Sequence, residues 1–299
     1  MMKKLISAIQ FISIVLVFIL LFITPTAILP VSKSLLERIN PKEMELFFPL
    51  LLTFSIYISY SYWLLIKNTN QSKLSVYIKL VAATFLLFPL MGFIESSFWL
   101  DSLKVVDNNE YVKIFFRYFI TFTLFSTYLS LLYKQNNTTD QNGKNLLNLK
   151  LLTQRLLLIG GIYILLYNIF GYFVAWQFEA TRIYYTGTSE LKDFFTMLWI
   201  NFSDPKFVIV HFIRGILFGL SGYIFYTMLN CSKLKKSIIL ALIFGGFGFQ
   251  IILPNPIFPE MVRISHFIET TTSMIVFGMI SIYVFDYKKY KTSNSVFSK

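Results

Sequence analysis

The chain has 299 residues, of which 56% are hydrophobic and only 14% are charged, and its formal net charge is +12. Soluble domains carry about 25% charged residues and about 45–50% apolar ones. The composition therefore excludes an ordinary water-soluble globular protein, a disordered chain and a secreted disulfide scaffold. The single cysteine, Cys231, also excludes an intramolecular disulfide and a thiolate metal cluster.

Eight apolar stretches are long enough to cross the hydrocarbon core as helices, which takes about 20 residues each. The predicted spans are 5–29, 46–66, 74–98, 111–133, 151–176, 206–229, 235–253 and 262–285. The first stretch is longer than a signal-peptide core of about 7–15 residues, so we expect it to remain as a helix. The sequence predicts an all-α polytopic membrane protein in which residues 1–299 form a single membrane domain.

The charges of the connecting segments predict the orientation. With the N-terminus in the cytoplasm, the segments on that side hold 15 basic residues against two acidic ones, and those on the other side hold 8 basic and 11 acidic residues. Cytoplasmic loops are enriched in Lys and Arg, so both termini are predicted to be cytoplasmic, in the plasma (inner) membrane. The expected partner is the lipid bilayer. No nucleic-acid partner is expected, because topology accounts for the basic charge, and the sequence leaves the oligomeric state open.

A polar cytoplasmic linker, residues 134–150, divides the chain into a four-helix half of residues 1–133 and another of residues 151–299. We find no convincing sequence repeat between the halves. In the outer connection, Ser189 is predicted to cap a helix whose apolar face includes Leu191 and Trp199. Such a helix would lie on the outer leaflet or pack on the bundle, and its spacing fits both arrangements.

Several glycines are predicted to let neighbouring helices approach closely. Gly215 and Gly219 form a small-xxx-small pair in the sixth span, and Gly245, Gly246 and Gly248 lie together in the seventh.

Ionisable residues inside the spans are the strongest indication of a site, because each costs about 2.5–3.5 kcal/mol at mid-bilayer. His211 and Arg214 are three residues apart and share a helix face, and Arg263, His266 and Glu269 repeat that step. All of these residues belong to the outer halves of their spans: Glu95, Arg117, His211, Arg214, Arg263, His266 and Glu269. They predict an outward-facing charged pocket lined by the third, fourth, sixth and eighth spans, with Gln177 and Arg182 at its rim.

The leading hypothesis is an anion site. Arg117, Arg214 and Arg263 would offer guanidinium groups to a phosphate or carboxylate. Glu95 and Glu269 would balance their charge, and His266 would move a proton. The ligand would be an anionic small molecule or a lipid headgroup, held for transport or for modification.

Two alternatives remain open, so the sequence does not decide whether the protein is an enzyme. His211, His266, Glu95 and Glu269 would bind a divalent metal such as zinc in a membrane hydrolase, with His266 and Glu269 as candidate catalytic residues. The nearby arginines would repel such a cation. In the other alternative, the charges form ion pairs that lock helices together in a non-catalytic scaffold or partner subunit. Trp176, Tyr184 and Tyr185 are expected in the interfacial aromatic belt.

Two segments carry a resemblance. Residues 253–270 (LPNPIFPEMVRISHFIET) resemble a segment of a group of uncharacterised bacterial multi-spanning membrane proteins. Residues 170–177 (FGYFVAWQ), followed by residues 184–187, are similar to another segment of that group. The resemblance covers mainly the second half of the chain and includes Arg263, His266 and Glu269. It implies a bacterial envelope protein and no particular activity.

Overall fold

Apolar runs of this length form helices because a bilayer offers no water to the backbone, so each N–H and C=O must be paired within the segment. The computed structural model describes residues 2–99, 108–134 and 146–296. Eight of its helical segments are long and apolar enough to span a membrane: Ser7–Ile28, Phe47–Lys67, Lys73–Phe98, Asn109–Leu132, Leu149–Gln177, Pro205–Met228, Lys233–Ile252 and Glu260–Tyr287. The predicted all-α, eight-span architecture is confirmed, and each predicted span ends within two residues of the observed one. Most of the predicted linker, residues 135–145, lies outside the described residues.

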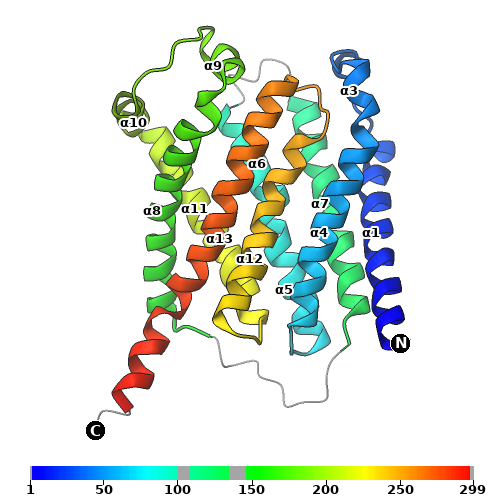
Figure 1. Cartoon of the computed structure of the whole chain (residues 1–299), viewed down its shortest axis with the longest axis vertical. Helices are drawn as coiled ribbons and strands as arrows, with labels where there is room; N and C mark the ends of the chain where they lie inside the picture. Colours follow the sequence, from blue (N-terminus) through cyan, green and yellow to red (C-terminus); the bar gives the residue numbers. More distant parts are fainter. Residues whose placement is uncertain (1, 100–107, 135–145, 297–299) are drawn as a thin grey trace.

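The helices form one upright bundle (Figure 1). The first half contains α1 (Met2–Ile28), α2 (Lys33–Leu36), α3 (Pro41–Glu45), α4 (Phe47–Lys67), α5 (Lys73–Phe85), a π-helical turn (Leu86–Leu90), α6 (Met91–Trp99) and α7 (Asn108–Leu132). The second half contains α8 (Leu149–Phe173), a 3-10 turn (Ala175–Gln177), α9 (Glu179–Thr186), α10 (Phe194–Ser203), α11 (Pro205–Met228), α12 (Lys233–Phe249), a second 3-10 turn (Gln250–Ile252) and α13 (Glu260–Val296). The halves pack together where α4 contacts α12 and α5 contacts α11.

The short helix α10 begins later than predicted. Its cap is Asp193, whose Oδ1 accepts a hydrogen bond from the Thr196 backbone N–H at 3.0 Å. Hydrogen bonds from Thr196 lower the pKa of Asp193, so the carboxylate stays charged at the positive end of the helix. The predicted Ser189 cap and the inclusion of Leu191 in the helix are therefore wrong. Phe195 and Trp199, one turn apart, are 76% and 75% exposed, which favours a location against lipid.

Glycines make the closest helix crossings. A Cβ atom on Gly215 of α11 would lie 2.6 Å from the Tyr163 Cβ and 2.9 Å from the Gly160 Cα of α8. A Cβ atom on Gly248 of α12 would lie 2.5 Å from the Thr271 backbone nitrogen of α13. These contacts confirm the predicted role of both glycine groups in close helix approach.

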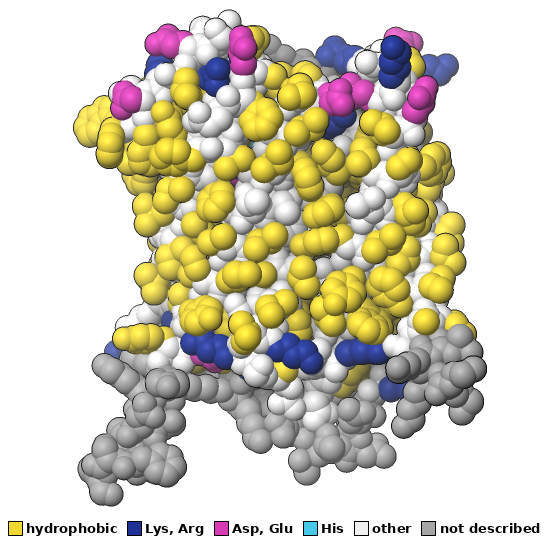
Figure 2. Space-filling model, in the orientation of Figure 1, with side chains coloured by type: hydrophobic (Ala, Val, Ile, Leu, Met, Phe, Trp, Pro, Cys, Tyr) yellow, Lys and Arg dark blue, Asp and Glu magenta, His cyan; other side chains and the backbone are white. Residues whose placement is uncertain are grey.

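Charged side chains mark the two ends of the bundle. Lys and Arg side chains with little visible Asp or Glu line one edge of a wide apolar band, and the opposite edge carries most visible Asp and Glu side chains together with further Lys and Arg (Figure 2). The beginning of α1 and the end of α13 lie at the basic end (Figure 1). We call this the termini end and the other the distal end.

Candidate functional site

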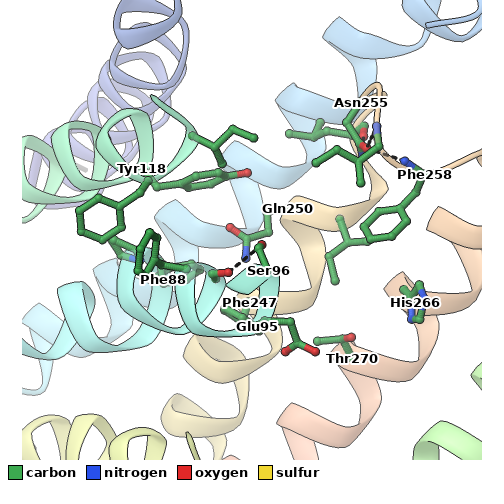
Figure 3. Close-up of a pocket in the computed structure, with 18 of the residues that line it drawn as sticks. Phe88, Glu95, Ser96, Tyr118, Phe247, Gln250, Asn255, Phe258, His266 and Thr270 are labelled. Atoms are coloured by element: carbon green, nitrogen blue, oxygen red, sulfur yellow. Dashed lines mark hydrogen bonds between the residues drawn. The ribbon is translucent and has the colours of Figure 1, made fainter. Parts of the chain in front are cut away.

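A cavity of about 640 Å³ lies between the helices at the distal end of the bundle. All eight spans contribute to its wall, so the cavity is broader than the predicted four-helix pocket. Most lining side chains are apolar or aromatic, including Phe93, Trp176 and Phe258. Figure 3 shows part of this wall, in which Glu95 and His266 approach from different helices.

One charged cluster joins α6 to α11. Glu95 forms an ion pair with Arg214, and Arg214 Nη1 lies 3.3 Å from His211 Nδ1. Because a guanidinium can only donate hydrogen bonds, Nδ1 must be the unprotonated nitrogen of this imidazole. The Arg214 side chain is 1% exposed and that of Glu95 is 33% exposed. Both residues line the cavity, and Glu95 is the more accessible member of the ion pair.

A second cluster joins α13 to α9. His266 Nδ1 lies 3.9 Å from Glu269 Oε2, and its Nε2 lies 3.0 Å from the Tyr185 hydroxyl. Burial raises the pKa of Tyr185, and the nearby Tyr184 and Glu269 raise it further. The hydroxyl thus keeps its proton at neutral pH and can donate it to an unprotonated Nε2. Thr270 Oγ1 donates to Glu269 Oε2 at 2.8 Å.

The two clusters meet at Arg214. Glu269 attracts the Arg214 guanidinium electrostatically, and in Figure 3 the Glu95 carboxylate points toward Thr270, the neighbour of Glu269. Arg214 thus has Glu95 as its ion-pair partner, and Glu269 is close enough to attract it as well. Arg214 Nε and Gln250 Oε1 are buried and have no hydrogen-bond partner among the residues that the structure describes. Because buried polar atoms are nearly always hydrogen-bonded, the cluster has capacity for a further polar group.

The other two predicted arginines have separate partners. Arg117 lines the cavity, where its Nε donates to the Leu29 carbonyl at 2.7 Å and its Nη2 lies 3.7 Å from Glu110 Oε2. Arg263 donates to Glu43 Oε2 of α3 at 2.5 Å and is not among the residues that line the cavity. The three guanidinium groups therefore do not surround one anion. Folding of the α1–α4 connection back over the bundle provides Glu43, which sequence spacing does not reveal.

The predicted metal ligands do not form a metal site. Across the described residues, no group of three or more His, Cys, Asp or Glu side chains is placed to hold a metal ion. Arg214 lies against both Glu95 and His211, which places a cation where the metal would have to bind.

Two aromatic residues expected in the interfacial belt also line the cavity. Tyr185 contacts His266 and also lines the cavity, as does Trp176. Neither Gln177 nor Arg182, the predicted rim, is a lining residue. Arg182 donates to the carbonyls of Trp176 at 2.7 Å and Ser189 at 2.6 Å, which fixes the turn that carries α9. Helix α9 reaches α13 through the Thr181–Ser265 hydrogen bond of 2.6 Å, a tertiary contact with no signature in either segment alone.

Comparisons with known proteins find no matching family model, no matching curated protein and no matching solved structure. The function is therefore inferred from the geometry of this cavity, within a multi-pass helical membrane protein.

Proposed function

We propose that this protein binds a zwitterionic, lipid-like amphiphile in its distal cavity, with the apolar body against the aromatic wall and the headgroup at the charged clusters. The observation that carries the proposal is a mostly apolar cavity whose most accessible charged group is a carboxylate beside a buried guanidinium.

The size and lining of the cavity support a ligand of this kind. Small-molecule sites are typically about 300–1,000 Å³, mostly apolar, with a few convergent polar groups. The cavity of about 640 Å³ lies within this range. Its apolar wall suits acyl or similar chains, and its polar groups are confined to one region.

The exposed fractions favour a headgroup with both signs of charge. Side-chain exposure is 33% for Glu95, 11% for Glu269 and 1% for Arg214. A purely anionic ligand would meet Glu95 before Arg214 and be repelled. A headgroup with an amine and a phosphate can pair the amine with the carboxylates and the phosphate with Arg117, which lines the cavity and is 13% exposed. The proposal therefore keeps the predicted lipid headgroup as the ligand but makes it zwitterionic where the sequence predicted an anion.

The charge distribution supports the predicted orientation. The termini end carries the basic edge of the apolar band, and cytoplasmic segments are enriched in Lys and Arg. We accordingly place this end in the cytoplasm and the cavity on the outer side of the plasma membrane of a bacterial cell.

The test compares two short-chain phospholipids that differ in the headgroup. Dihexanoyl phosphatidylethanolamine and dihexanoyl phosphatidylglycerol would be titrated against the detergent-purified protein by calorimetry. We expect the amine lipid to bind about tenfold more tightly or better. Glu95→Gln and Glu269→Gln should each weaken its binding by about tenfold or more, because a charged hydrogen bond contributes about 1.5–3 kcal/mol. Glu190→Gln, on an exposed connection, is the matched control and should bind like the parent.

Three outcomes would contradict the proposal. Tighter binding of the glycerol lipid would show that the cavity prefers an anionic ligand to a zwitterionic one. If the parent and the folded Glu95→Gln and Glu269→Gln proteins bind the amine lipid equally well, neither carboxylate contributes to binding. Binding of neither lipid, with folding preserved when Glu95 and Arg214 are exchanged, would indicate a structural ion pair in a scaffold.

A further inference from the structure

The order of connections repeats between the two halves. In the first half, two short helices, α2 and α3, lie between the first and second spans, and a tight turn joins the second span to the third. In the second half, α9 and α10 lie between the fifth and sixth spans, and a tight turn joins the sixth to the seventh.

The two tight turns also share a sequence. Over residues 70–80, six of eleven positions are identical to the residue 160 positions later: Asn70 and Asn230, Ser72 and Ser232, Lys73 and Lys233, Leu74 and Leu234, Ile78 and Ile238, Leu80 and Leu240. Each serine caps the following helix and accepts a hydrogen bond at 3.4 Å from the backbone N–H three residues on. The expectation of no repeat between the halves missed this match because it is confined to one turn and the start of one helix.

Equivalent parts of the halves contact each other. Thr69 and Leu229, again 160 positions apart, form an isolated antiparallel bridge. An antiparallel pairing of equivalent residues is what a twofold axis between them produces. The second span contacts the seventh (α4 with α12), and the sixth contacts the third (α11 with α5), which is the same contact with the halves exchanged.

The third span of each half departs from regular α-helix where it lines the cavity. A π-helical turn, Leu86–Leu90, contains Pro89, and a 3-10 turn, Gln250–Ile252, ends α12 before Pro254. Phe88 and Gln250 from these turns line the cavity. Irregular helical turns in the equivalent spans of two repeats, with a cavity between the repeats, resemble the architecture of secondary transporters.

The paired turns close the termini end. Gln71 Nε2 donates to the Thr227 carbonyl at 2.6 Å, and the Tyr133 hydroxyl donates to the Gln71 carbonyl at 3.0 Å. Thr69 and Leu229, which form the bridge between the turns, are both buried. We call these five residues the inner gate. The Gln71–Thr227 hydrogen bond and the Thr69–Leu229 bridge join opposite halves, so a relative movement of the halves would break both.

We propose that the two halves are related by an approximate twofold axis along the membrane normal and rock against each other, so that the cavity opens alternately to the distal side and, through the inner gate, to the termini side. The protein would then transport its ligand rather than modify it. The identity of the ligand rests on the proposed function, whereas the movement does not.

The test labels one cavity position from both sides of the membrane. In a Cys231→Ser background, Ser96→Cys places a thiol in the cavity wall. Sealed vesicles of each orientation would be treated with a membrane-impermeant methanethiosulfonate, and labelling of the peptide containing residue 96 would be measured by mass spectrometry. We expect labelling from both sides. Glu190→Cys, exposed at the distal end, is the control for vesicle orientation and should label from that side alone.

A disulfide across the inner gate then tests the movement. Opposite residues of an antiparallel pair have Cα atoms about 4.5–5.5 Å apart, which suits a disulfide, so Thr69→Cys and Leu229→Cys should cross-link on oxidation. The cross-link should slow labelling of residue 96 from the termini side by at least about tenfold, because it holds the inner gate closed. Labelling from the distal side should continue, and reduction should restore labelling from the termini side.

Three results would overturn the inference. Labelling from the distal side alone would show a fixed outward pocket. Labelling from both sides that the cross-link does not alter would show that the gate is not on the route. Failure of the two cysteines to cross-link would show that residues 69 and 229 do not lie against each other. Two-sided, gated labelling in a protein that binds neither phospholipid would refute the proposed ligand and leave the movement standing.

Discussion

Arg214 and Glu95 form an unequal ion pair, because the guanidinium is buried whereas the carboxylate is partly exposed. Removing Glu95 leaves a buried cation with only Glu269 nearby, and breaking a buried pair typically costs about 3–5 kcal/mol. Replacing Arg214 with an apolar side chain of similar volume leaves a carboxylate that water can reach.

We therefore predict that Glu95→Gln lowers the free energy of unfolding by about 3 kcal/mol, and that Arg214→Met lowers it by less. Reversible unfolding in mixed detergent micelles would measure both. A larger loss for Arg214→Met than for Glu95→Gln would contradict this ranking, and the double variant should resemble Arg214→Met alone.

The single thiol beside the inner gate gives a prediction about pH. Burial raises the pKa of Cys231, while Lys236 and Lys235 act in the opposite direction. Less thiolate is then present at neutral pH than for an ordinary cysteine, and the thiolate is the reactive form. N-Ethylmaleimide should modify Cys231 more slowly than it modifies free cysteine, and the rate should rise with pH beyond the point where the rate for free cysteine levels off. A rate equal to that of free cysteine at neutral pH would show that the pKa of Cys231 is not raised.

At the level of elements, the crossing of α8 and α11 sets the position of Arg214. Gly215→Ala would put a methyl group against the Gly160 backbone, and overpacking of this kind costs about 1–3 kcal/mol. We expect lower thermal stability and weaker phosphatidylethanolamine binding, because the displaced α11 carries Arg214 with it. Gly161→Ala, whose new Cβ would meet nothing within 4 Å, is the matched control and should be neutral or slightly stabilising. Equal stability of the two variants would contradict the tight crossing.

Element positions could be predicted where one physical cause dominates. The spans follow from apolar length, and the glycine contacts follow from small-residue spacing. The start of α10 was missed because Ser189 and Asp193 are both good caps by type, and tertiary folding of the connection decides between them. The π-helical turn was missed as well, although Pro89 prevents a regular helix there.

At the level of the whole molecule, the orientation has a direct test. In the Cys231→Ser background, Lys150→Cys lies at the termini end and Glu190→Cys at the distal end, and both positions are exposed. An impermeant maleimide added to intact cells lacking an outer membrane barrier should label Glu190→Cys alone, because the basic end faces the cytoplasm. Labelling of Lys150→Cys alone would invert the topology and place the cavity on the inner side.

The candidate site could be predicted only in part. Charge in apolar spans identified Glu95, Arg214, His266 and Glu269, all of which line the cavity. The pairing of Arg263 cannot be predicted, because its partner Glu43 belongs to the α1–α4 connection, whose position depends on tertiary contacts. The sequence alone places Tyr185 in the aromatic belt, and only the structure shows its contact with His266.

Photo-crosslinking tests most directly whether an amphiphile occupies the cavity. Phosphatidylethanolamine with a diazirine in one acyl chain would be added to the purified protein, irradiated, and its adducts mapped by peptide mass spectrometry. We predict adducts on the cavity wall at Phe93, Trp176 and Phe258, removed by excess unlabelled lipid and reduced in Glu269→Gln. Adducts confined to outward-facing residues such as Phe195 and Trp199, with the cavity wall unmodified, would contradict the proposed function.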